Sequence, residues 1–405
     1  MNNILVAQSG GPTAAINATL AGVLKGALSD RKVDTVFGAL NGIEGVLSEN
    51  FKDMASFKSS KALTLLKQTP SSYLGSCRKK LPTLEEDETT YIKIFDIFKK
   101  HNITSFFYIG GNDSMDTVDK LSAYASAKNI EIKIAGVPKT IDNDLCKTDH
   151  TPGFGSAAKF VANSIKQLSL DTGVYKMKSA VILEIMGRNA GWLTAAAALS
   201  NTKDKTFADI IVLPEVSFDT EKFLKKVEKV ANEKGTVMIA LSEGIKDKDG
   251  AYVGEALAKR NSADDKFNHA VLGGVGRITE GLINSELGIK TRCIELSTLQ
   301  RCFSCLASKT DIDESFLCGK TAYEFAKSGK TGFMAGYTRI SDKPYKIKID
   351  EFKASDVANF EKKIPAEMIS EDNFSLTDKF FDYALPLIEG ESPVIYENGT
   401  IKFAE

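Results

Sequence analysis

One heptapeptide, Pro138-Lys139-Thr140-Ile141-Asp142-Asn143-Asp144, places two carboxylates and a lysine directly after an apolar run. At this spacing, one carboxylate can accept a proton from a hydroxyl group while the other helps to hold Mg²⁺. The lysine can cover the negative charge that develops on a phosphoryl group during transfer. A solvated charged turn has a similar composition, so the heptapeptide by itself leaves both interpretations open.

Two glycine-containing loops also follow apolar runs, Ser9-Gly10-Gly11-Pro12-Thr13 and Gly110-Gly111-Asn112-Asp113-Ser114. Glycine lets a backbone approach phosphate oxygens closely, and the N-terminus of a following helix supplies N–H donors. The first loop matches neither common nucleotide-binding glycine motif, and Ser114 can serve merely as a helix cap. Three such loops in one chain favour a ligand site over three ordinary turns.

The second half of the chain supplies groups that suit an anionic sugar. Arg188, in Met186-Gly187-Arg188-Asn189, offers a planar fork for a phosphate ester, and Glu243 offers an acceptor for hydroxyl groups. Arg292 and Arg301 add two more guanidinium groups. We therefore predict an anionic small molecule that bridges two lobes. For any single arginine, a surface ion pair is the alternative.

The elements that must position these loops follow an alternating pattern. Short β-branched apolar runs alternate with amphipathic stretches, which is typical of an α/β protein. In parallel sheets, ligands bind beyond the carboxyl ends of the strands, where these loops lie. The predicted strands cover residues 3–7, 35–40, 105–109, 133–137, 180–185, 210–213 and 236–241, and the predicted helices cover residues 14–28, 88–100, 155–170, 190–199 and 220–232.

Length and composition narrow the functional classes. The 405 residues suggest two to three domains, and a formal net charge of −1 argues against nucleic acid or an anionic membrane as a partner. Six cysteines are too few for a disulfide scaffold, and we expect Cys302 and Cys305 to be ordinary thiols, with zinc or redox chemistry as the alternative. Because the first residues lack a signal-peptide pattern, we expect a cytoplasmic protein.

The ordered motifs resemble the phosphofructokinase family, and specifically its diphosphate-dependent branch. The resemblance runs from residue 8 to about residue 337, and its most specific parts are the P-[GK]-T-I-D-N-D and M-G-R patterns. It implies two Rossmann-like three-layer α/β lobes with mostly parallel sheets and an active site in the cleft between them. The lobe that binds the phosphoryl donor would comprise residues 1–154 and about 300–345. The lobe that binds fructose 6-phosphate would comprise residues 155–299 and about 346–405, including a C-terminal extension.

The resemblance implies transfer of a phosphoryl group from diphosphate to the 1-hydroxyl of fructose 6-phosphate, reversibly and with Mg²⁺, in a homodimer or homotetramer. Asp142 is similar to the general base, acting with Lys139, Thr140 and Arg188. The implied donor contacts are Gly11, Arg78, Asn112, Asp113 and Ser114. The implied sugar-phosphate contacts are Thr140, Asp142, Met186, Gly187, Arg188, Glu243, Arg292, Thr298 and Arg301, with Arg292 reaching a neighbouring subunit. The implied metal ligands are Asn112, Asp113 and Asp144.

Two positions bear on the donor. Relatives that use ATP have glycine where Asp113 and Lys139 stand, and a carboxylate at 113 would repel the α-phosphate of ATP. Lys139 adds a compact cation that suits diphosphate. The chain departs from relatives at Asn112, where many have a metal-associated aspartate, and at Thr298, where ATP-dependent relatives have histidine. The alternatives are an ATP-dependent 6-phosphofructokinase and a noncatalytic nucleotide-sensing α/β protein.

Overall fold

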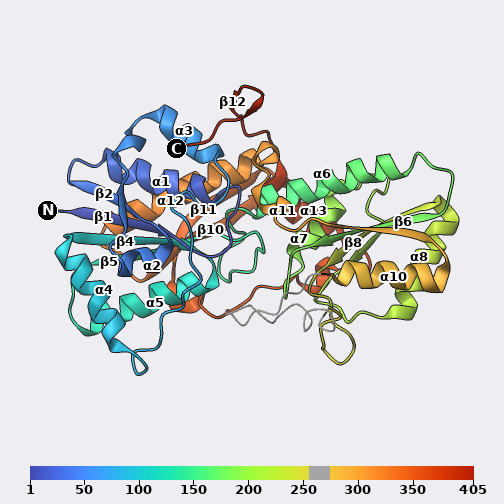
Figure 1. Ribbon diagram of the computed structural model, residues 1–405, viewed down its shortest axis with the longest axis horizontal. Helices are drawn as coiled ribbons and strands as arrows, with labels where there is room; N and C mark the ends of the chain where they lie inside the picture. The colour runs from blue at the N-terminus through green and yellow to red at the C-terminus, as the bar shows by residue number, and fades with distance from the viewer. Residues whose placement is uncertain (255–273) are drawn as a thin grey trace.

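The computed structural model describes residues 1–254 and 274–405, which form two lobes (Figure 1). The large lobe is built on a seven-stranded sheet and the small lobe on a four-stranded sheet. Helices cover both faces of each sheet, so each lobe has three layers. The predicted α/β class with mostly parallel sheets is confirmed.

The large sheet has the strand order β11-β10-β5-β4-β1-β2-β3. The five central strands run parallel, and the two edge strands, β3 and β11, are antiparallel to their neighbours. The parallel register places the carboxyl ends of β1, β4 and β5 at one edge of the sheet. The strands are β1 (Asn3–Gln8), β2 (Thr35–Ala39), β3 (Phe51–Asp53), β4 (Ile103–Gly110), β5 (Lys133–Pro138), β10 (Phe333–Asp342) and β11 (Tyr345–Lys353).

Strand β1 shows why the sequence forms a buried central strand. All six of its residues are buried, as expected when helices cover both faces of a parallel sheet. Ile4 and Val6 pack on one face, and Leu5 and Ala7 pack on the other. The first face carries α1 (Ile16–Ser29), α3 (Ser60–Gln68) and α12 (Lys309–Lys327), and the second carries α2 (Gly42–Leu47), α4 (Glu88–Lys100) and α5 (Asn112–Ala127).

Helices α1 and α12 approach each other closely because glycine lies at their contact. A Cβ atom on Gly319 would lie 2.0 Å from the Thr19 carbonyl oxygen, and one on Gly22 would lie 2.0 Å from the Phe316 carbonyl oxygen. No other residue type fits at either position without separating the helices. The contact therefore joins an early element of the chain to a late one.

The small sheet has the order β7-β8-β6-β9 and is parallel throughout. Figure 1 shows α6 on one face of this sheet and α8 and α10 on the other. The strands are β6 (Ser179–Ile185), β7 (Ile210–Val212), β8 (Thr236–Ser242) and β9 (Lys290–Glu295). The helices are α6 (Phe154–Thr172), α7 (Trp192–Ala195), α8 (Thr220–Lys234), α10 (Val275–Leu287) and α13 (Asp378–Ala384).

The C-terminal region differs from the predicted division at about residue 345. Strand β11 pairs along its whole length with β10 in the large sheet, so assigning residues 346–353 to the small lobe is wrong. Phe380 and Leu387 do pack into the small lobe. The chain then returns to the large lobe, where the Gln68 amide binds the Ile395 and Lys402 carbonyl oxygens. Half-exposed β11 lacks the apolar run that marked the other strands.

The remaining elements are short. The predicted helix over residues 190–199 is α7 followed by a 3₁₀ turn, whereas the other predicted elements agree to within a few residues. Within residues 1–254 and 274–405, no helix combines the length and the apolarity that crossing a membrane requires.

All six cysteines are free. The other short elements are η1 (Ala55–Lys58), η2 (Ala196–Ser200), α11 (Leu299–Cys302), η4 (Ser304–Leu306), η5 (Ala354–Asp356), η6 (Ala366–Met368), η7 (Leu385–Ile388), β12 (Tyr396–Glu397) and β13 (Thr400–Ile401).

Candidate functional site

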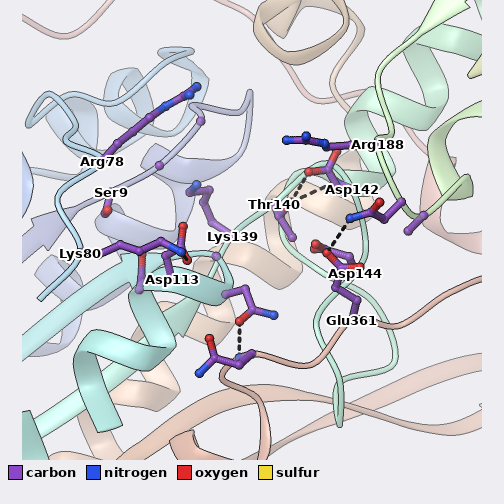
Figure 2. A pocket seen from close by; sticks show the side chains of 18 of the residues that line it. Ser9, Arg78, Lys80, Asp113, Lys139, Thr140, Asp142, Asp144, Arg188 and Glu361 are labelled. Atoms are coloured by element: carbon purple, nitrogen blue, oxygen red, sulfur yellow. Dashed lines mark hydrogen bonds and ion pairs between the residues drawn. The ribbon is translucent and has the colours of Figure 1, made fainter. Parts of the chain in front are cut away.

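A cavity of about 1310 Å³ lies where loops after the strands of the two sheets meet. Figure 2 shows Ser9, Arg78, Lys80 and Asp113 on one side of this cavity, and Asp142 and Arg188 together on the other. The cavity brings together eleven of the residues predicted from the sequence. They are Gly11, Arg78, Asn112, Asp113, Ser114, Lys139, Thr140, Asp142, Asp144, Arg188 and Glu243.

The loop after β1 forms one wall of the cavity. Gly10 has φ of +75°, and a Cβ atom there would lie 2.9 Å from Lys139 Nζ. The Ser76 hydroxyl donates to the Gly10 carbonyl oxygen at 2.6 Å, and the Gly10 N–H donates to the Cys77 carbonyl oxygen at 3.2 Å. These bonds tie the glycine loop to the segment that carries Arg78. Glycine is favoured at position 10 because its φ is positive, and the missing side chain also leaves room for the lysine.

The N-terminus of α5 forms a second wall. Gly111 precedes the helix, and Asn112, Asp113 and Ser114 form its first turn. The free N–H groups of such a turn favour an anion nearby. Asp113 Oδ1 lies 2.8 Å from Lys80 Nζ, and this hydrogen-bonded pairing raises the pKa of Lys80. The side chains are 59% and 62% exposed, so the pair is weak and a ligand can separate it.

Two cations, Lys139 and Arg78, line the cavity, and a third, Arg301, lies just outside its lining. Lys139 is only 3% exposed, and its burial lowers its pKa to about 8, against the opposing pull of Asp142 and Asp144. Burial and the neighbouring Arg78 also lower the pKa of Arg301. At neutral pH, Lys139 is still mostly protonated. Cations crowded at this density are stabilised by a ligand that carries several negative charges.

Asp142 and Asp144 lie next to these cations. The Asp142 Oδ2 accepts a hydrogen bond from the Thr140 hydroxyl at 3.3 Å, and the Asp142 N–H donates to the same hydroxyl at 3.0 Å. Burial raises the pKa of Asp142. Burial, followed by the charge of Asp142, raises the pKa of Asp144 to about 7. A carboxylate with a raised pKa is a better proton acceptor than an exposed one.

On the small-lobe side, a network of hydrogen bonds fixes the loop after β6. Glu243 Oε1 accepts from the Gly187 N–H at 3.3 Å, and the Ser242 hydroxyl donates to the Gly187 carbonyl oxygen at 2.6 Å. Burial raises the pKa of Glu243 to about 7. The Arg188 guanidinium lies 5.6 Å from the centre of the Tyr252 ring. These contacts hold a cation and a carboxyl group on the same cavity wall.

The other five predicted residues lie outside the cavity lining. Met186 donates its N–H to Gln300 Oε1 at 3.2 Å, and Gly187 lies behind Glu243. Arg301 lies on α11 close to Gly11. A Cβ atom added to Gly11 would lie 3.2 Å from Arg301 Nη1. Arg292, on the edge strand β9, and Thr298 are both exposed.

The predicted metal ligands are not equally available. Asn112 Nδ2 donates to the Phe360 carbonyl oxygen at 2.6 Å, and its Oδ1 accepts from the Asn359 N–H. Asp113 pairs with Lys80, whereas the Asp144 carboxylate has no partner from another side chain in the described parts of the chain. Those same parts contain no group of three or more His, Cys, Asp or Glu side chains that would hold a metal.

Several lining residues were assigned no role from the sequence: Lys80, Asn189, Tyr252, Asn359 and Glu361. Lys80 belongs to the basic run after Arg78, and Asn189 directly follows Arg188. Their positions next to predicted site residues could therefore have identified both of them. Glu361 reaches the cavity from the region that the sequence assigned to a C-terminal extension of the small lobe. No local pattern marks it, because its position depends on contacts with distant residues.

Comparison with known proteins gives a consistent result. Residues 3–324 match the protein-family model described as Phosphofructokinase. The chain is 43% identical over 396 residues to a pyrophosphate–fructose 6-phosphate 1-phosphotransferase of Xanthomonas campestris, covering 97% of this chain and 93% of the relative. A relative with the same name from Methylococcus capsulatus is 40% identical, with coverage of 98% and 94%. The crystal structure of a pyrophosphate-dependent phosphofructokinase from Nitrosospira multiformis superposes with a TM-score of 0.90 at 37% identity, covering 99% of this chain and 95% of that one.

Proposed function

The chain belongs to the phosphofructokinase family, and we infer that it transfers a phosphoryl group from diphosphate to the 1-hydroxyl of fructose 6-phosphate. The products are fructose 1,6-bisphosphate and phosphate, and the reaction is reversible. The observation that carries this assignment is the buried Lys139 beside Asp142 in a cavity that joins both lobes. The site residues below are our proposal for how the reaction proceeds.

Asp142 is the proposed general base. Its raised pKa suits removal of the proton from the 1-hydroxyl as that oxygen attacks the terminal phosphorus of diphosphate. The Thr140 hydroxyl, at 3.3 Å, holds the carboxylate in one orientation. The bond between the terminal phosphorus and the bridging oxygen breaks, and phosphate leaves. Phosphoryl transfer of this kind depends mainly on positioning and on stabilisation of charge.

The cations of the large lobe are proposed to bind diphosphate. Lys139, Arg78 and Arg301 surround the space next to the glycine loop, where the first turn of α5 adds N–H donors. Their charges oppose the negative charge that builds up on the leaving phosphate. On the other wall, Arg188 is proposed to bind the sugar phosphate and Glu243 a hydroxyl group of the sugar.

Enzymes of this family generally need a divalent metal ion, and we propose Mg²⁺. Asp144 fits this role because its carboxylate lines the cavity without a side-chain partner in the described ranges. Mg²⁺ commonly takes one or two carboxylates and completes its shell with water and substrate phosphates. Asn112 fits less well, because both polar atoms of its amide bind the Asn359–Phe360 backbone. A bound Mg²⁺ would neutralise charge on the diphosphate oxygens.

Donor choice is proposed to rest on Asp113 and Lys139. The Asp113 carboxylate lies on the cavity wall next to α5, where its charge opposes the α-phosphate of a nucleotide. Lys80 reduces this repulsion, because it partly neutralises the carboxylate. We also propose that Arg292 completes the site of a neighbouring subunit, that the enzyme is a dimer or tetramer, and that it acts in the cytoplasm.

Initial rates with diphosphate and with ATP, at equal Mg²⁺ and saturating fructose 6-phosphate, test this function. We expect turnover with diphosphate and little with ATP, and equal turnover with ATP would overturn the donor assignment. The double variant Asp113→Gly/Lys139→Gly should lose its activity with diphosphate. Unchanged diphosphate kinetics in that variant would contradict the roles of both residues. Sugar-phosphate binding without any turnover would favour a noncatalytic protein instead.

A further inference from the structure

The segment Asn359–Lys362, named the strap here, crosses from the large lobe to the small lobe along the cavity. It begins at Asn112, whose amide holds the Asn359 N–H and the Phe360 carbonyl oxygen. Asn359 has φ of +65°, and its side chain donates to Asp116 Oδ1 at 3.3 Å. The start of the strap is therefore fixed to the first turn of α5.

The middle of the strap binds the loop that carries the proposed base. Glu361 forms an antiparallel bridge with Leu145, and the Lys362 N–H donates to the Asp144 carbonyl oxygen at 2.7 Å. In Figure 2, Glu361 lies directly beside Asp144. The strap thus extends this loop as an added strand-like segment.

The Glu361 carboxylate connects the strap to the sugar side of the cavity. Its Oε1 accepts from Asn189 Nδ2 at 3.1 Å, and Asn189 Oδ1 accepts from the Tyr252 hydroxyl at 2.8 Å. The Tyr252 ring lies against Arg188. A chain of three contacts therefore runs from the strap to the cation proposed to bind the sugar phosphate.

Lys362 anchors the far end of the strap. Its Nζ donates to the Asp149 and Thr148 carbonyl oxygens at 2.7 and 3.2 Å and lies 5.2 Å from the centre of the Trp192 ring. Trp192 Nε1 donates back to the Lys362 carbonyl oxygen at 2.9 Å. Trp192 is the single tryptophan of the chain, so its fluorescence reports on this anchor.

From these contacts, we propose that Glu361 is a positioning residue for fructose 6-phosphate. Through Asn189 and Tyr252 it holds Arg188 in the orientation that binds the sugar phosphate, while the strap keeps that loop in register with the loop of Asp142. The proposal rests on the proposed function. It adds a residue that acts on acceptor binding through its contacts to Arg188. A hydrogen bond to a charged group has a net worth that corresponds to about a tenfold change in an equilibrium constant.

The test compares Glu361→Ala with Glu361→Gln, because glutamine retains an oxygen that can accept from Asn189. In Glu361→Ala, the KM for fructose 6-phosphate should rise about tenfold, while the KM for diphosphate changes less than about twofold. Glu361→Gln should restore most of the loss. The control is Lys363→Ala, the exposed side chain directly after the strap, which should behave as wild type. Equal melting temperatures would show that all variants are folded.

Wild-type kinetics for fructose 6-phosphate in Glu361→Ala would overturn the proposal, although the phosphoryl transfer itself would stand. A loss that Glu361→Gln fails to repair would also overturn it, because it would show that charge rather than the hydrogen bond matters. If the wild-type enzyme turned over no donor, the proposed function would fail first. The dissociation constant for fructose 6-phosphate, followed by Trp192 fluorescence, would then decide: a tenfold rise in Glu361→Ala supports the positioning role, and no change refutes it.

Discussion

Burial controls the chemistry of individual residues at this site. Lys139 is nearly inaccessible and its pKa falls to about 8, whereas burial raises the pKa of Glu243 to about 7. Both groups therefore carry charge that the surrounding protein disfavours in the free enzyme. Such perturbed groups cluster at functional sites because a bound ligand supplies the compensating charge.

The charge of Lys139 should set the alkaline limit of diphosphate use. Because its pKa is lowered to about 8, the cation is lost as pH rises through that value, and kcat/KM for diphosphate should fall. In Lys139→Arg the side chain stays charged, so this fall should shift beyond pH 9. Titration of diphosphate itself affects both proteins equally, so the difference between the two pH profiles isolates the lysine. Identical profiles would refute the assignment.

Glu243 should reduce the stability of the protein above neutral pH. Its folded pKa of about 7 is higher than the usual 4.5, so the cost is absent below about pH 4.5, grows as pH rises, and is complete above pH 7. Glu243→Gln keeps an acceptor for the Gly187 N–H but carries no charge. We expect it to raise the free energy of unfolding at pH 8 by up to about 3 kcal/mol, with no gain near pH 4. Urea unfolding at the two pH values measures the difference.

At the scale of helices and strands, the local sequence pattern predicts most of the elements that position the site. The heptapeptide from Pro138 to Asp144 was predicted at a strand end, and it begins at the last residue of β5 and contributes four residues to the cavity lining. Strand β11 was missed because it lacks a continuous apolar run, although Tyr345, Ile347 and Ile349 alternate with lysines in the pattern of a half-buried strand. The strap was missed because its partner Asn112 is 247 residues away from Asn359, and no local pattern encodes a contact at that separation.

The contact between α1 and α12 gives a prediction at this scale. Gly319→Ala places a methyl group against the Thr19 carbonyl oxygen, so it should lower the free energy of unfolding by about 1 to 3 kcal/mol. The matched control is Gly281→Ala on α10, where a Cβ atom has nothing within 4 Å. That change should instead stabilise the protein by up to about 1 kcal/mol through helix propensity. Chemical denaturation of the two variants tests whether backbone contact, rather than loss of glycine as such, matters.

At the scale of the whole molecule, Arg292 is exposed on edge strand β9, and we propose that it completes the site of a neighbouring subunit. The cavity of a single chain lacks this residue in its lining, although its family resemblance implies contact with the sugar phosphate. In a closed symmetric assembly, one subunit can supply a residue to the site of the next. The sequence indicated the residue type, but only an assembly can place its side chain.

Mixing two variants that are impaired in different ways tests this arrangement. Asp142→Asn should lower activity about a hundredfold or more by removing the base, and Arg292→Ala should weaken fructose 6-phosphate binding. When both are co-expressed, a mixed dimer has one site with native Asp142 and native Arg292. Random pairing should therefore restore about a quarter of wild-type activity. No recovery in dimers shown to be mixed would place Arg292 in its own subunit's site or outside any site.

The large lobe is discontinuous in the chain: α1 packs against α12, and β5 pairs with β10, with the four-stranded sheet of the small lobe encoded between them. During synthesis on a ribosome, the N-terminal strands emerge well before the helix and strands that cover them. The sheet of the small lobe can fold first because it is complete and parallel. Strands β1 to β5 meanwhile keep one face uncovered until α12 has been synthesised. Nascent chains halted before residue 309 should therefore recruit chaperones, and chains extended past residue 353 should release them.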